Sequence, residues 1–199
     1  TNILYNMNMD TDFSLIPFKD PLPAGLLVVI GQHALTEKML ELVAALALKQ
    51  RVTILDCGNR SNMYAVAKTI RPYTSDPAAV MANIRLSRAF TCYQVLAMLE
   101  AVAAAPPHEP LIVLDLLATF LDEDVELKDS QRLLTRSLAC LRQLSQSAPV
   151  VVSAKPVPQI SAARTGFLDQ LRSFSDAHWE EPSALPAEQG LQPTLFAMM

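Results

Sequence analysis

Short apolar segments that alternate with amphipathic ones constrain the fold of this chain most strongly. Four of the apolar segments read LLVVI, VTILD, LIVLD and PVVVS. A continuous apolar run of about four to eight residues is typical of a strand buried on both faces of a parallel sheet. The segments between these runs carry apolar residues at helical spacing, which indicates βαβ crossovers. We therefore expect an α/β domain with a mostly parallel sheet between layers of helices.

The same pattern suggests how the chain is divided. Its 199 residues, 51% of them hydrophobic, are enough for one domain with a buried core. Residues 1–24 show weak periodicity, so we interpret them as an N-terminal arm and residues 25–199 as the domain. Near the C-terminus, AHWEEP (177–182) and QPTLFAMM (192–199) predict two short strands. We expect these strands to form an antiparallel edge of the sheet.

Composition excludes several classes of protein. The net charge of −4 gives no general attraction to nucleic acid. The three cysteines contain no CxxC pair and the three histidines are scattered, so we expect neither a disulfide framework nor a metal site. No apolar run reaches the ~18 residues of a membrane span, and the polar start does not resemble a signal peptide. A cytoplasmic protein without membrane association is expected.

Four segments, taken in order, resemble the core of the RecA-like recombinases over roughly residues 25–156. NIRLSRAFTCYQ (83–94) is similar to the family's Asn-x-x-x-x-Arg-Ala-Phe-x-x-x-Gln segment, and LIVLD, ending at Asp115, lies where the family has its Walker B strand. The helix with Gln-Arg at 131–132 resembles the one after the first DNA-binding loop. APVVVSAKPV (148–157) resembles the strand that ends in the family's Asn-Gln pair. The resemblance implies a RecA-like three-layer domain and a setting in DNA recombination or repair.

The phosphate loop is where the chain departs from this family. A working loop reads G-x-x-x-x-G-K-[ST], with the lysine on the phosphates and the hydroxyl on Mg²⁺. From Gly31 onwards, Thr36 takes the place of the second glycine, Glu37 that of the lysine, and Lys38 that of the Ser/Thr. A carboxylate beside a polyanion costs several kcal/mol even at an effective dielectric of ~20. His33 lies in this degenerate loop, where a helix N-terminus would still accept a small anion.

Two further departures point the same way. Where the family has a catalytic glutamate after the second strand, this chain has Cys57 or Gly58, and neither polarises water as a carboxylate does. The Asn-Gln pair is replaced by Ala154 and Lys155. We interpret Asp115 as structural, and Lys155 as either a solvated lysine or an anion contact at the strand end. We expect a pseudo-ATPase with no catalytic residue and no bound cofactor, acting as a partner or regulatory subunit.

The two segments that hold DNA in the family are poorly suited to it here. FLDEDVELKDS (120–130) has five acidic residues against one basic residue, Lys128. KPVPQISAARTG (155–166) offers Lys155 and Arg164 but no aromatic residue for stacking on bases. DNA binding by the chain alone is therefore not expected. The acidic segment is either a solvated turn or a docking face for a basic partner.

Other interpretations remain open at this point. One alternative is an active ATPase that uses ATP and Mg²⁺, with Lys38 or Lys155 in place of the missing lysine. Another is a signalling or scaffold domain that shares only the architecture. Gln192, Leu195 and Phe196 resemble a sliding-clamp-binding peptide, but such a short pattern often arises by chance and we favour a terminal edge strand. A protein partner or a homo-oligomer is expected under the main interpretation.

Overall fold

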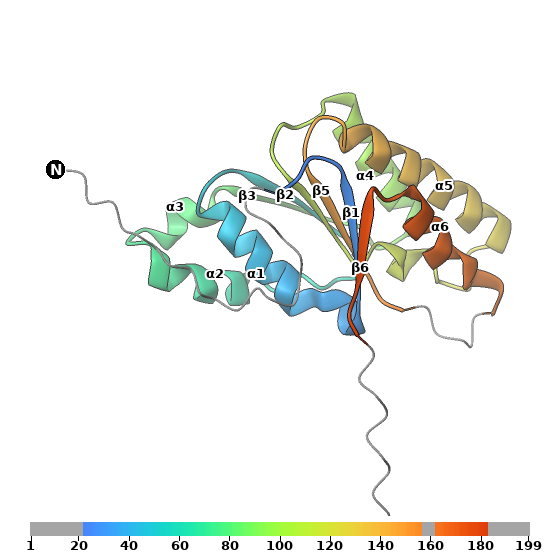
Figure 1. Ribbon diagram of the computed structural model, residues 1–199, viewed down its shortest axis with the longest axis horizontal. Helices are drawn as coiled ribbons and strands as arrows, with labels where there is room; N and C mark the ends of the chain where they lie inside the picture. Colours follow the sequence, from blue (N-terminus) through green and yellow to red (C-terminus); the bar gives the residue numbers. More distant parts are fainter. Residues whose placement is uncertain (1–21, 157–161, 183–199) are drawn as a thin grey trace, which may run out of the picture.

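The computed structural model describes residues 22–156 and 162–182, which form a single sheet covered by helices on both faces (Figure 1). The sheet has six strands in the order β3-β2-β4-β5-β1-β6, and every neighbouring pair is parallel. The strands are β1 (Leu26–Ile30), β2 (Val52–Asp56), β3 (Ile84–Arg88), β4 (Leu111–Leu114), β5 (Val150–Ala154) and β6 (Ala177–Glu180).

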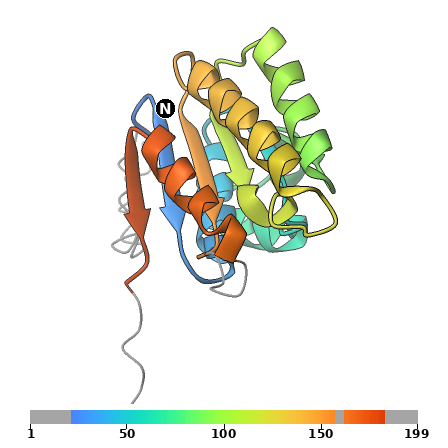
Figure 2. The same cartoon turned by 90° about the vertical axis from the view of Figure 1, so that its right-hand side faces the viewer.

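Helices form the two outer layers. The α-helices are α1 (Thr36–Ala47), α2 (Met63–Ile70), α3 (Pro77–Met81), α4 (Cys92–Ala104), α5 (Leu127–Leu144) and α6 (Gly166–Phe174). Short 3₁₀ turns are η1 (Gln32–Leu35), η2 (Arg71–Tyr73), η3 (Leu116–Thr119) and η4 (Ala162–Arg164). The first three α-helices cover one face of the sheet and the last three cover the other (Figures 1 and 2). The predicted three-layer α/β architecture with a mostly parallel sheet is confirmed.

Local sequence explains most of these elements. Strands β2, β4 and β5 are buried along their whole length, as the continuous apolar runs predict. Helix α5 buries one stripe that includes Leu134, Leu138 and Leu141, and exposes its charged face. Side-chain oxygens of Asn62 and Thr91 accept backbone N–H bonds at the starts of α2 and α4. Two apolar cores result, one on each side of the sheet.

One expectation about the edge of the sheet was wrong. β6 was expected to lie antiparallel, but it pairs with β1 in parallel register, with Val28 opposite His178. The reason is that α6 carries the chain back across the sheet before β6 begins, and such a crossover yields a parallel strand. At the start of α1, Leu35 holds the N-cap position, and the Thr36 hydroxyl donates to the carbonyl of His33 at 2.6 Å. Residues 192–199, predicted as a second edge strand, lie outside the described residues.

The parallel arrangement brings all the strand ends together. Because every strand points the same way, the residues that end or follow the strands lie along one edge of the sheet, where open α/β sheets bind ligands. Several of these residues are charged or glycine: Gly31, Asp56, Arg88, Asp115, Lys155 and Glu181. Among the described residues, no helix is both long and apolar enough to cross a membrane.

Candidate functional site

Two buried carboxylates occupy the middle of this edge. Asp56 ends β2 and is 0% exposed, and Asp115 follows β4 and is 1% exposed. A buried carboxylate needs partners of opposite charge or several hydrogen bonds, because burial alone disfavours the charged form. Both receive them, and the partners come from the chain itself.

Asp56 is saturated by the loop that follows it. Its oxygens accept the backbone N–H groups of Arg60 at 2.8 Å and Ser61 at 2.9 Å, and the Ser61 hydroxyl at 2.6 Å. The guanidinium of Arg88, at the end of neighbouring β3, donates from Nε at 3.1 Å. Arg88 also donates to the Ser61 hydroxyl at 2.6 Å, so one network fastens the loop to two strands.

The protonation of Asp56 follows from these contacts. Burial raises its pKa, but the Ser61 hydroxyl, the two backbone N–H groups and the Arg88 charge outweigh burial and hold the pKa below its ordinary value of 3.8. The carboxylate is therefore charged and fully engaged at neutral pH. The Asp56 carboxylate therefore serves to hold the loop after β2 in place.

Asp115 is neutralised by two cations. Arg60 Nε lies 3.1 Å and Lys155 Nζ lies 3.3 Å from the same oxygen, Oδ2. The Asp115 backbone N–H donates to the Ser153 hydroxyl, and Asp115 itself adopts a left-handed conformation with φ of 51°. The interpretation of Asp115 as structural is consistent with this geometry. Lys155, in turn, is an ion-pair partner at the strand end, which differs from a freely solvated lysine.

Cys57 and Gly58, compared above with the position of the recombinases' catalytic glutamate, are tightly packed. Cys57 is 2% exposed, and burial together with the negative charges of Asp56 and Asp115 raises the pKa of its thiol far above the ordinary value. Gly58 packs so tightly that a Cβ on it would lie 2.6 Å from the Cβ of Asp115. Any side chain at position 58 would displace Asp115, so the glycine serves close packing.

The segment compared above with a phosphate loop follows a strained, tightly wound path. His33, Ala34 and Leu35 all have left-handed φ values, 52°, 55° and 52°. Left-handed backbone costs roughly 1–2 kcal/mol for each residue with a Cβ. Leu35 is 5% exposed and folds back over Gly31, on which a Cβ would lie 2.5 Å from Leu35 Cδ2. An apolar side chain thus fills the space at the strand end.

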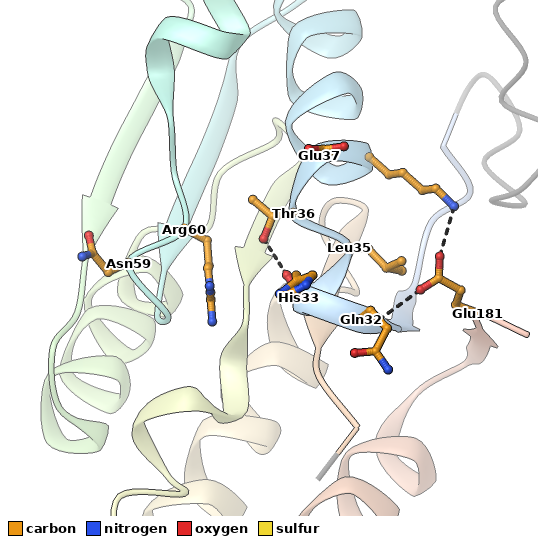
Figure 3. A pocket seen from close by; sticks show the side chains of 9 residues that line it. Gln32, His33, Leu35, Thr36, Glu37, Asn59, Arg60 and Glu181 are labelled. Atoms are coloured by element: carbon orange, nitrogen blue, oxygen red, sulfur yellow. Dashed lines mark hydrogen bonds and ion pairs between the residues drawn. The ribbon is translucent and has the colours of Figure 1, made fainter. Parts of the chain in front are cut away.

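A carboxylate of the chain already occupies this loop. Glu181, just after β6, accepts the backbone N–H of Gln32 at 3.1 Å through Oε2. Its other oxygen, Oε1, lies 3.6 Å from Lys38 Nζ (Figure 3). Lys38 also lies over the ring of Trp179, 5.7 Å from the ring centroid. The loop amide and the lysine nearest to it are therefore both engaged by one internal anion.

An open pocket of about 520 Å³ lies between this loop and the loop after β2. Its walls include Glu37 and Glu181 on one side and Arg60 on the other (Figure 3). His33 is exposed at its rim, as expected for a loop residue, and lines the pocket. Two carboxylates therefore line this pocket, and the nearby cations Lys38 and Arg60 have carboxylate partners.

These residues do not fit a magnesium nucleotide. A phosphate loop needs free backbone N–H groups and a free lysine, whereas here Glu181 engages both the Gln32 amide and Lys38. The Walker B-like Asp115 has two cationic partners in place of a divalent ion. Among the described residues, no group of three or more His, Cys, Asp or Glu side chains is arranged to hold a metal ion.

The two segments compared with DNA-binding loops are linked through a buried arginine. Arg164, one of the two basic residues of the second segment, is 5% exposed and donates to the carbonyls of Phe120 and Val125 and to the Ser130 hydroxyl. It holds the acidic segment in place and is not available to DNA. Residues 157–161, and the clamp-peptide residues Gln192, Leu195 and Phe196, lie outside the described residues.

Gly31, Thr36, Glu37, Lys38, Asp115 and Lys155 were singled out separately in the sequence, and the structure brings them to one edge of the sheet. Sequence reasoning missed the partners that decide their chemistry: Arg60, Arg88 and Glu181. A signal was present, because a charged residue directly after a predicted parallel strand must lie at the same edge. No protein-family model matches the chain, and no curated protein matches its sequence.

Proposed function

We propose that this protein is a non-catalytic RecA-like subunit that acts as a partner or regulator in DNA recombination or repair. The observation that carries the proposal is that the Glu181 carboxylate accepts the backbone N–H of Gln32 and pairs with Lys38. The position of a nucleotide phosphate is taken by a carboxylate of the chain. Binding of ATP would require that carboxylate to leave and the negative charge of Glu37 to be overcome.

The setting in recombination or repair is supported by the order of the RecA-like segments along the chain. The segments at 83–94 and 148–157 become β3 with the start of α4, and β5 with its carboxyl end. Asp115 follows β4, which lies between β2 and β5. A subunit that only provides a binding surface needs the fold but not a working nucleotide site. Its own side chains can therefore fill that site without loss of function.

The alternative of an active ATPase depends on Lys38 or Lys155. Lys38 pairs with Glu181 and Lys155 with Asp115, so neither lysine is free to bind a triphosphate. This pairing favours the non-catalytic proposal. A scaffold domain that shares only the architecture would show the same damaged loop, and its partners would have no connection with recombination, repair or replication.

Calorimetric titration with ATP and Mg²⁺ tests the proposal. We expect no saturable heat of binding from the purified protein, and no ATPase activity above background. The variants Lys38→Ala and Lys155→Ala serve as matched controls for the ATPase alternative. Tight, Mg²⁺-dependent binding of ATP that either variant abolishes would overturn the proposal.

A further inference from the structure

A second hollow lies on the other side of the loop that follows β2. It has a volume of about 410 Å³ and is lined by residues from the loop after β2, the end of β3 and the turn η3. The lining includes Cys57, Gly58, Ala89, Phe90, Thr119 and Asp122. None of the charged residues that fill the phosphate loop lines this hollow, so it is a separate feature of the same sheet edge.

One large exposed aromatic side chain, Phe90, lines this hollow. Phe90 is 66% exposed, and Tyr93, one turn further at the start of α4, is 51% exposed. The Phe90 backbone N–H donates to the Gln94 side chain at 2.8 Å, which fixes the backbone from which the ring projects. An exposed aromatic ring beside a pocket is typical of a protein-binding surface.

The wall of the hollow also contains an unused polar group. Thr119 is 9% exposed, and its hydroxyl has no hydrogen-bond partner among the described residues. A buried hydroxyl without a partner carries a desolvation cost of about 1–3 kcal/mol.

The rim is negatively charged. Asp122 lines the hollow, and Glu123, Asp124 and Glu126 follow it in the same exposed segment. None of these four carboxylates forms an ion pair with another residue in the part of the chain that the structure describes. Arg164, buried below, donates to the carbonyls of Phe120 and Val125 and so holds the segment in shape.

We infer that this hollow binds a basic segment of a partner protein that carries an apolar anchor residue. The anchor packs against Phe90 inside the hollow, and Lys or Arg side chains on either side meet the carboxylates of the rim. The inference deepens the proposed function by naming the surface and the chemistry of the partner, and it rests on that proposal only in expecting a protein partner.

The chain's own outlying segments lack the required charge. Residues 1–21 contain one lysine against three aspartates, residues 183–199 contain no basic residue, and residues 157–161 contain no charge. A second copy of the chain has a net charge of −4 and is repelled by an acidic rim. Charge complementarity therefore selects a separate, basic partner.

Fluorescence anisotropy with a labelled octapeptide tests the inference, using a peptide with four Lys or Arg residues around a central Leu-Phe pair. We expect saturable binding to the full chain, weakened about ten-fold or more by Phe90→Ala. The double variant Glu123→Gln, Asp124→Asn should bind several-fold more weakly at low salt and respond less to added salt. Tyr73→Ala, which removes an exposed aromatic residue elsewhere, and Glu41→Gln are the matched controls.

Three outcomes would overturn the inference. These are absence of saturable peptide binding, equal binding by Phe90→Ala and Tyr73→Ala, and unchanged binding by a peptide whose Leu-Phe pair is replaced by alanines. Sedimentation of the free chain tests whether a second copy occupies the hollow. A dimer that Phe90→Ala dissociates, in the absence of peptide binding, would assign the hollow to a second copy. The ATP titration tests the proposed function independently of peptide binding. Either proposal can therefore be rejected while the other stands.

Discussion

Arg60 Nε lies 3.1 Å from Asp115 Oδ2 at the carboxyl edge of the sheet, and Lys155 Nζ reaches the same oxygen from the neighbouring strand end. The backbone N–H of Arg60 donates at the same time to Asp56. One residue thus joins both buried carboxylates, and its loop covers the edge of the sheet. The charges at this edge are balanced within the chain.

Replacing Arg60 with methionine should lower the free energy of unfolding by about 2 kcal/mol. Removing one partner of a fully buried pair costs roughly 3–5 kcal/mol, and the partial exposure of Arg60 and the presence of Lys155 reduce that cost. Urea unfolding monitored by circular dichroism measures the change. Arg51→Met, at an exposed position before β2, is the control.

The double-mutant cycle sharpens this prediction. Asp115→Asn removes the charge that Arg60 neutralises, so Arg60→Met should destabilise the Asp115→Asn background much less than the wild type. Additive effects of the two substitutions would show that the guanidinium and the carboxylate do not stabilise each other.

Acid should weaken the fold through Asp56. Its folded pKa lies below the ordinary value of 3.8, so its contribution to stability is fully present above about pH 4 and is lost as the pH falls through the lower, folded value. Asp56→Asn should therefore reduce stability at neutral pH and flatten its decline below about pH 4. Unfolding curves measured at several pH values check this, with Ser61→Ala expected to be intermediate. An unchanged acid slope in Asp56→Asn would contradict the assignment.

The sequence predicted what depends on local pattern. Continuous apolar runs predicted β1, β2, β4 and β5, because a buried strand is recognised from residues that are neighbours in the chain. The interpretation of residues 31–38 as a degenerate phosphate loop stays a prediction. Burial of Arg164 and the direction of β6 depend on how distant elements pack, and short motifs carry no such information.

The chemistry of the site was the part that the sequence could not predict. Glu181 lies 149 residues from its partner Gln32, and Arg60 lies 55 residues from Asp115. A lysine or arginine at a strand end looks the same in sequence whether it is free or paired, and only the fold decides which carboxylate it meets. Lys155 illustrates this, since a solvated side chain or an anion contact was expected at its position and the fold pairs it with Asp115.

Glycine at position 33 should stabilise the protein. His33 is exposed and left-handed, and glycine removes a strain of roughly 1–2 kcal/mol while adding about 0.5–1 kcal/mol of backbone entropy to the unfolded chain. We expect His33→Gly to gain about 0.5–1 kcal/mol in urea unfolding. Glu41→Gly, at an exposed position inside α1, is the matched control and should lose about 1 kcal/mol. A loss of stability in both variants would show that residue 33 is not strained.

Removal of the Glu181 charge should loosen the phosphate loop without creating a nucleotide site. In Glu181→Gln the Gln32 amide loses its charged acceptor and Lys38 loses its partner, so hydrogen exchange at the Gln32 amide should accelerate about five-fold, as expected for a partly exposed charged hydrogen bond of about 1 kcal/mol. NMR-detected exchange measures this directly. Glu37→Gln, a carboxylate lining the same pocket with no hydrogen bond to Gln32, is the control and should change exchange less than about two-fold. Equal acceleration in the two variants would mean that Glu181 does not hold the loop, and binding of ATP by Glu181→Gln would mean that this carboxylate alone blocks the site.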